Sequence, residues 1–169
     1  MKRPIALVGA VALAAALSGT ALASSWSDSG IQWATNKPFT LSVVDNTTGI
    51  WPALVVAAAA DWSLSSAADV VIGGHGKIKV TVSNISSPTS PCGWMTVTLT
   101  SGHLKTAAIT VNDACTGDHQ IVICQELGHA LGMPDHRLDL PPSPSCMAPA
   151  LYGPHPIQDD FDELASLYP

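Results

Sequence analysis

The feature that most constrains this chain is a helical segment that ends at a glycine and carries polar side chains on one face. Asp118 is a suitable N-cap for a helix over residues 119–131. Gly132 stands where a helix commonly ends on a residue with a left-handed backbone. Because residues four apart share one face of a helix, Gln125 and His129 are expected to point the same way.

Glu126 adds a catalytic group to this face. The spacing of Gln125, Glu126 and His129 matches the pattern H-E-x-x-H, except that glutamine replaces the first histidine. In that pattern two histidines hold a zinc ion, and the glutamate polarises a zinc-bound water and carries its proton. A sharp turn at Gly132 lets a ligand three residues later return to the metal, and Asp135 occupies that position.

A second motif lies downstream, in the segment 145–149, where we expect Met147 in a tight turn. A methionine turn below the metal accompanies the zinc helix in metzincin metalloproteases. Together with Met147, the pattern E-x-x-H-x-x-G-x-x-D from Glu126 to Asp135 resembles the snapalysin-like metzincins, small secreted bacterial zinc proteases that use aspartate as the third ligand. The stretch G-M-P-D-H, which ends at His136, is especially similar.

The resemblance covers most of the chain in order. The part from Pro38 through an alanine-rich segment to Trp62 resembles the matrixin-like group, and so does the ending from Met147 to Tyr168. The resemblance implies an α/β (α+β) metzincin-like (zincin) fold, with a twisted mixed sheet, two main helices, a Met-turn and a C-terminal helix. It also implies a cleft below the edge strand of the sheet.

The local sequence pattern predicts elements in an order that suits this fold. Strands are expected where β-branched and alternating residues recur, at 39–44, 69–72, 77–82, 95–100 and 107–111. The last two flank a short turn and are expected to form a hairpin. Helices are expected at 52–63, 119–131 and 159–168.

The glutamine at position 125 bears directly on the metal. Glutamine offers only a neutral carbonyl oxygen as a ligand, whereas zinc prefers imidazole, thiolate or carboxylate. Gln125, His129 and Asp135 are therefore expected to hold Zn2+ more weakly than two or three histidines would. Asp135 is preferred over His136 as the third ligand, although an aspartate after a proline is also a common turn residue. A further ligand at His136, or a site without Zn2+, remains an alternative.

The N-terminus predicts export. Two basic residues precede an apolar run at 5–17, and A-L-A at 21–23 matches a small-residue cleavage site. The run is shorter than the ~20 residues that a membrane-spanning helix needs. We expect residues 1–23 to be a signal peptide, residues 24–169 to be one metallopeptidase domain, and the protein to be secreted.

The four cysteines predict disulfides, because an even number in an exported chain is typical of oxidised pairs. Four cysteines allow three pairings, of which we favour Cys92–Cys115 and Cys124–Cys146. The second pair would tie the predicted zinc helix to the loop after it. The sequence has no C-x-x-C spacing that would support a zinc site made of cysteines.

The net charge of −6, without a basic cluster, disfavours nucleic acid and anionic membranes as partners.

Two functional hypotheses follow from the motifs. The first hypothesis is a secreted zinc endopeptidase with Glu126 as general base, whose peptide substrate lies along an edge strand at 95–100. The second, motivated by Gln125, is a catalytically inactive metalloprotease-like binding protein in which zinc binding is weakened or lost.

Overall fold

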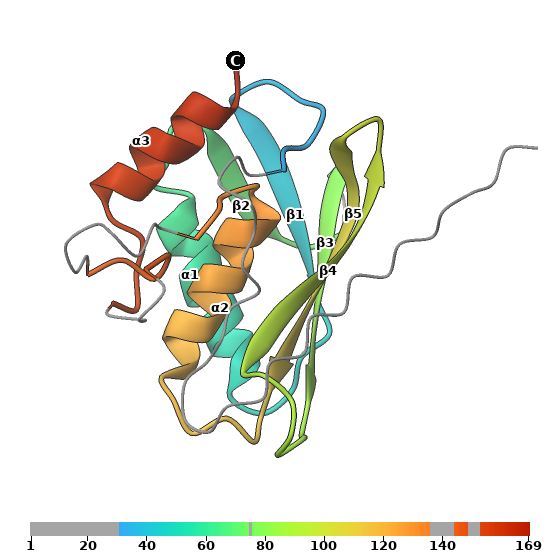
Figure 1. The fold of residues 1–169 in the computed structure, drawn as a ribbon, viewed down its shortest axis with the longest axis vertical. Coiled ribbons are helices and arrows are strands. Elements are labelled where there is room, and N and C mark those ends of the chain that lie inside the picture. Colours follow the sequence, from blue (N-terminus) through green and yellow to red (C-terminus); the bar gives the residue numbers. More distant parts are fainter. Residues whose placement is uncertain (1–30, 75, 136–143, 149–152) are drawn as a thin grey trace, which may run out of the picture.

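The computed structural model describes residues 31–74, 76–135, 144–148 and 153–169 (Figure 1). The predicted signal peptide, residues 1–23, lies outside the described residues, and so does His136. Within the described ranges no helix is long and apolar enough to cross a membrane.

The described residues form five strands and three helices, in the order that the sequence predicted. They are β1 (Phe39–Asp45), α1 (Trp51–Trp62), β2 (Ala68–Ile72), β3 (Ile78–Ile85), β4 (Gly93–Thr100), β5 (His103–Asn112), α2 (His119–Ala130) and α3 (Gln158–Leu167). β5 begins earlier than predicted because Ser101 and Gly102, both with positive φ, complete the hairpin turn by themselves. β3 runs further than predicted because its pairing with β5 continues to Ile85.

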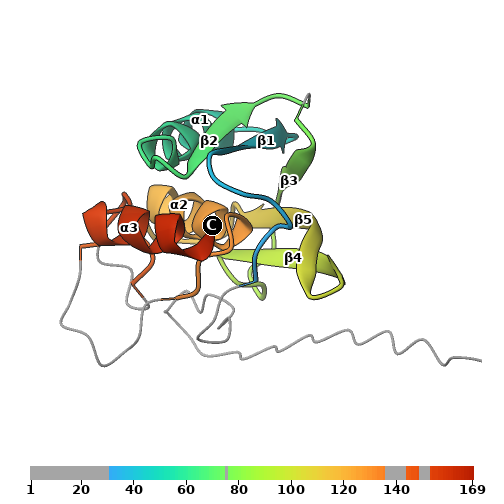
Figure 2. The same cartoon turned by 90° about the horizontal axis from the view of Figure 1, so that it is seen from above.

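The strands form one twisted mixed sheet in the order β2-β1-β3-β5-β4. The first four of these strands are parallel neighbours, and β4 runs antiparallel to β5 at one edge. Figures 1 and 2 show α1 and α2 side by side on one face of the sheet. α1 packs near β2, whereas α2 packs against β4 and β5. The sheet order therefore places α2 beside the edge strand.

The core lies between the sheet and these two helices. Alternate residues of the strands point into it and are fully buried, among them Leu41, Val80 and Ile109. Each such side chain stabilises the fold by about 1.5–3 kcal/mol relative to an exposed position. Trp51 and Trp62 at the ends of α1 are also fully buried in this core.

Candidate metal centre

α2 brings the predicted polar residues into the interior. Asp118 caps the helix as expected, because its Oδ1 accepts a hydrogen bond of 2.9 Å from the amide of Gln120. Every residue of α2 from 121 to 130 is buried, so the helix has no solvent face over this length. Burying a polar side chain is costly unless it finds a partner. The contacts of the buried polar residues therefore show what this helix holds together.

The end of α2 turns the chain back toward the helix. The amide of Gly132 donates to His129 O at 2.9 Å, and the amide of Met133 donates to Gly128 O at 3.0 Å. This is a Schellman turn, and its glycine has φ +97°, as the sequence predicted. The turn places the carbonyl of Met133 and the side chain of Asp135 next to His129.

His129 is held between these two groups. Its Nδ1 lies 2.9 Å from Met133 O, and its Nε2 lies 3.2 Å from Asp135 Oδ1. Since a carbonyl oxygen only accepts, Nδ1 carries a hydrogen, and a neutral ring would then turn a lone pair toward the carboxylate. Either a proton or a metal cation must therefore lie between Nε2 and Asp135. Burial alone would lower the pKa of His129, but the Asp135 and Glu126 carboxylates and Met133 raise it overall.

Gln125 joins the same carboxylate. Its Nε2 donates to Asp135 Oδ1 at 3.0 Å. The Asp135 side chain is 16% exposed. Gln125, His129 and Asp135, the three predicted ligands within the described residues, thus meet at one point. The fourth, His136, lies outside those residues.

The donor set fits zinc at two of these three positions. His129 has the arrangement of a zinc-binding histidine, since one ring nitrogen is fixed by a carbonyl and the other lies beside the Asp135 carboxylate in the interior. Asp135 supplies a carboxylate, whereas Gln125 has only its carbonyl oxygen to offer. Over the described ranges no group of three or more His, Cys, Asp or Glu side chains is arranged to hold a metal ion.

Glu126 is the buried acid beside this trio. It is 1% exposed, and its Oε2 has no hydrogen-bond partner among the described residues. Burial raises the pKa of Glu126 to about 7, with His129 lowering it and Asp135 raising it. The first residue of β4 touches this side chain, because a Cβ on Gly93 would lie 2.9 Å from Glu126 Cγ and 3.0 Å from Oε1. The edge strand therefore starts directly against the carboxylate.

The predicted Met-turn lies where the resemblance implies. The amide of Met147 donates to Ser145 Oγ at 2.8 Å, and that hydroxyl donates to Asp160 Oδ2 at 2.7 Å. Asp160 Oδ2 also accepts from the amide of Ile157 at 2.6 Å and so caps the start of α3. Met147 is fully buried. The turn is thereby fixed to α3 through a buried carboxylate.

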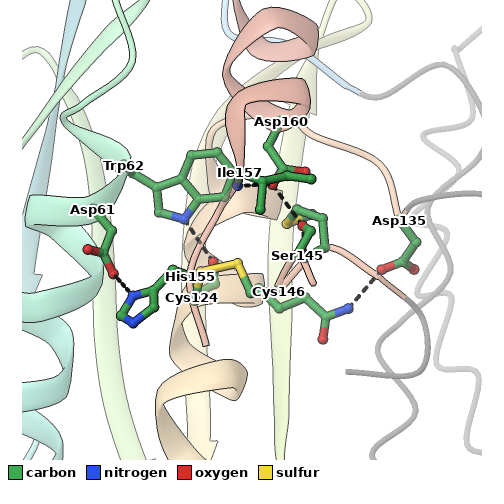
Figure 3. The surroundings of a disulfide bond; sticks show 11 residues. Asp61, Trp62, Cys124, Asp135, Ser145, Cys146, His155, Ile157 and Asp160 are labelled. Carbon is green, nitrogen blue, oxygen red and sulfur yellow. Dashed lines mark hydrogen bonds and ion pairs between the residues drawn. A yellow bond between two sulfur atoms is a disulfide. The ribbon is translucent and has the colours of Figure 1, made fainter. Parts of the chain in front are cut away.

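The side chain of Met147 packs directly on α2. A Cβ on Gly128 would clash with Met147 Sδ and lie 2.6 Å from Trp62 Cζ2, so only glycine lets these groups approach the helix. The indole of Trp62 donates to Cys124 O at 2.9 Å. Beside this contact, the Cys124–Cys146 disulfide joins α2 to the Met-turn (Figure 3). We call Trp62, Gly128, Met147 and this disulfide the floor of the site.

The second disulfide lies at the start of β4. Cys92 precedes the strand and is bonded to Cys115, which lies between β5 and α2. Both disulfides have the pairing favoured from the sequence. Cys124 and Cys146 are fully buried, whereas Cys92 and Cys115 are half-buried.

Four residues of the site were not singled out from the sequence. Gly128 could have been found, since a glycine inside a helix costs stability and often marks a close approach. Asp160 could have been recognised as an acid in the first turn of α3. Gly93 and Ser145 have no comparable local signal, because their roles depend on contacts with distant segments.

A separate hollow does not belong to this centre. It has a volume of about 580 Å3, and its lining includes Ser42, Gly76 and Lys77. None of its lining residues comes from α2, β4 or the Met-turn.

Comparison with known proteins bears on the fold. No protein-family model matches the sequence, and no curated protein sequence matches it. Among solved structures, the chain is similar to myroilysin, with a TM-score of 0.54 at 13% identity over 90% of this chain and 92% of that one. The chain thus has a mixed α/β, metzincin-like fold, as the sequence predicted.

Proposed function

We propose that this protein is a secreted zinc-dependent endopeptidase. The observation that carries the proposal is the state of Glu126, a fully buried carboxylate with one oxygen that lacks a hydrogen-bond partner among the described residues. Buried acids that serve only the fold are normally hydrogen-bonded. Glu126 instead lies beside His129 and Asp135, with the start of an edge strand against it.

His129 and Asp135 are the proposed zinc ligands, with the carbonyl oxygen of Gln125 as a weak third donor and His136 as an alternative. Zn2+, when bound, would polarise the scissile carbonyl and lower the pKa of a bound water. Such a donor set, with one imidazole and one carboxylate, is expected to bind zinc more weakly than a set of three histidines.

Glu126 is the proposed general base. A carboxyl with a pKa near neutrality accepts and releases a proton easily at physiological pH. It takes the proton of the attacking water and delivers it to the amine that leaves. Gly93 has no side chain that would block the approach to this group.

The edge strand β4 is the proposed substrate-binding element. Among the described residues β4 pairs only with β5 in the sheet, and its other edge is the proposed place for strand addition by an extended peptide. A peptide lying antiparallel to β4 would pass Gly93 and so present its backbone to Glu126. Backbone pairing of this kind gives affinity for protein substrates without demanding a particular sequence.

The test combines metal content with one matched pair of variants. Zinc is measured by elemental mass spectrometry on protein purified without chelators, and about one zinc per chain is expected. Glu126→Gln should lower kcat/KM by about 10²–10⁴-fold while the zinc content stays the same. The control is Glu163→Gln on α3, the other glutamate of the chain, which should retain full activity. Undiminished proteolysis by Glu126→Gln would contradict this mechanism.

A second candidate function is a metal-free binding protein on the same fold. The observation in its favour is the Gln125–Asp135 hydrogen bond, since a protonated His129 and the Gln125 amide together satisfy the Asp135 carboxylate without a metal. Gln125→His separates the two candidates. A wild type without zinc or proteolysis, converted by this substitution into a zinc-binding protease, supports the binding protein. Proteolysis by the wild type that a chelator abolishes excludes it.

A further inference from the structure

The last carbonyl groups of α2 are satisfied in two different ways. A helix leaves its final carbonyls without partners inside the helix. The carbonyls of Gly128 and His129 accept from the local turn at Gly132 and Met133. The next two carbonyls, those of residues 130 and 131, receive donors from segments far away in the sequence.

Trp33 and Tyr168 are these donors. The indole Nε1 of Trp33 donates to Ala130 O at 2.7 Å, and the Tyr168 hydroxyl donates to Leu131 O at 2.7 Å. The two residues also touch each other, because the amide of Trp33 donates to the Tyr168 hydroxyl at 3.4 Å. Both side chains are buried. The N-terminal and C-terminal parts of the described chain therefore meet at the end of α2.

The Tyr168 hydroxyl lies directly over the turn. A Cβ on Gly132 would lie 3.1 Å from this hydroxyl and 3.1 Å from Ile31 O, so the turn is enclosed on this side. Burial raises the pKa of Tyr168 to about 12, against the lowering effect of Trp33, so the hydroxyl keeps its proton at physiological pH. It is therefore a permanent donor to the Leu131 carbonyl.

We propose that Tyr168 is a positioning residue for the metal centre. Through Leu131 O it fixes the Gly132 turn, and this turn sets where the Met133 carbonyl and Asp135 meet the two nitrogens of His129. Tyr168 itself is not among the residues that contact His129 in this arrangement. The inference rests on the proposed function where it concerns zinc affinity, but the link from Tyr168 to His129 does not require a metal.

The experiment compares two hydroxyl deletions in the full chain. Tyr168→Phe removes the donor to Leu131 O, and Ser166→Ala removes a hydroxyl that donates to Glu163 O within α3 at 2.7 Å. Zinc affinity is measured by competition with a chromophoric chelator, alongside thermal unfolding. Tyr168→Phe should weaken zinc binding about 10-fold, the lower end of the loss seen when a direct hydrogen-bond partner of a ligand is removed, because Tyr168 acts one step further away, through Leu131 O. Its melting temperature should fall by only about 2–4 °C.

The control and a metal-free readout make the outcomes distinct. Ser166→Ala should leave zinc affinity unchanged, and zinc affinity unchanged in Tyr168→Phe would overturn the proposal. If the wild type binds no zinc, the proposed function fails, and the NMR signal of the His129 Nδ1–H decides instead. A shift of that signal in Tyr168→Phe, but not in Ser166→Ala, upholds the positioning role, and an unshifted signal in both overturns it. Trp33→Phe removes the donor to Ala130 O and applies the same test at the neighbouring carbonyl.

Discussion

The floor of the site and the polar residues above it are held in place very differently. The floor is fixed by a buried disulfide, by the indole of Trp62 on a helix carbonyl, and by close packing between Gly128 and Met147. The polar centre, by which we mean Gln125, Glu126, His129 and Asp135, is linked mainly through one partly exposed carboxylate, that of Asp135.

In the candidate metal centre, the contacts that set the shape of the site therefore differ from those that would set its chemistry. The contacts of the floor are a disulfide, apolar packing and one buried hydrogen bond to the backbone, so none of them needs a metal. The contacts of the polar centre are electrostatic and respond to protons, to metal ions and to single substitutions. Changes in the floor are therefore expected to alter stability, whereas changes in the polar centre are expected to alter binding and catalysis.

The largest effect is expected from removing the disulfide of the floor. The two disulfides span 23 and 22 residues, so loop-closure entropy assigns each about 3 kcal/mol. The double variant Cys124→Ala with Cys146→Ala also leaves a cavity under the site. We expect its free energy of unfolding to fall by about 4–5 kcal/mol. The pair Cys92→Ala and Cys115→Ala is the matched control at about 3 kcal/mol. Urea unfolding measures both, and equal losses would contradict a special role of the floor.

A smaller loss is expected from Gly128→Ala. Alanine favours a helix over glycine by about 1 kcal/mol, but its methyl group would collide with Met147 and Trp62. We expect overpacking to prevail, with a net loss of about 2 kcal/mol in urea unfolding. Gly117→Ala is the control, because a Cβ there would meet only Cys115 Sγ at 3.8 Å. A Gly128→Ala variant as stable as the wild type would show that Met147 can move aside.

The smallest change, and one of opposite sign, is expected from Glu126→Gln in zinc-free protein. Burial penalises the ionised carboxylate, so the neutral amide should stabilise the fold by about 1–2 kcal/mol at pH 8. Because the pKa of Glu126 is raised to about 7, wild-type stability should fall as the pH rises from 4.5 through 7. The gain should therefore vanish below about pH 4.5, where the carboxyl is protonated in both the folded and unfolded states. Unfolding curves across this range, with no gain at pH 8, would argue that Glu126 is well solvated.

The sequence predicts the frame of this molecule because its signals are local. Strand alternation, the Asp118 cap and the glycine after α2 each report on a few neighbouring residues, and the structure has all of them. The turn at Met147 and the pairing of the cysteines could be predicted from the order of the helices and strands alone. The ends of β3 and β5 were misplaced because pairing and turn geometry, rather than residue preference, set those ends.

The polar centre was predictable only in part. The spacing of Gln125, His129 and Asp135 indicates that they share one site, but it does not show that the glutamine amide donates to the carboxylate. The contact of Gly93 with Glu126 and that of Tyr168 with Leu131 join segments more than 30 residues apart. Such contacts depend on the packed structure, and no local pattern encodes them.

The Cys124–Cys146 bond also bears on how the chain withstands cleavage. A break in the backbone anywhere between these two residues would leave both pieces attached, since the disulfide joins the sequence on either side of the cut. A nicked molecule would be heavier by only the water consumed in the cut, and a reductant would then separate its fragments. A chain that meets proteases can thus be cut between Cys124 and Cys146 and still keep α2 bonded to the Met-turn.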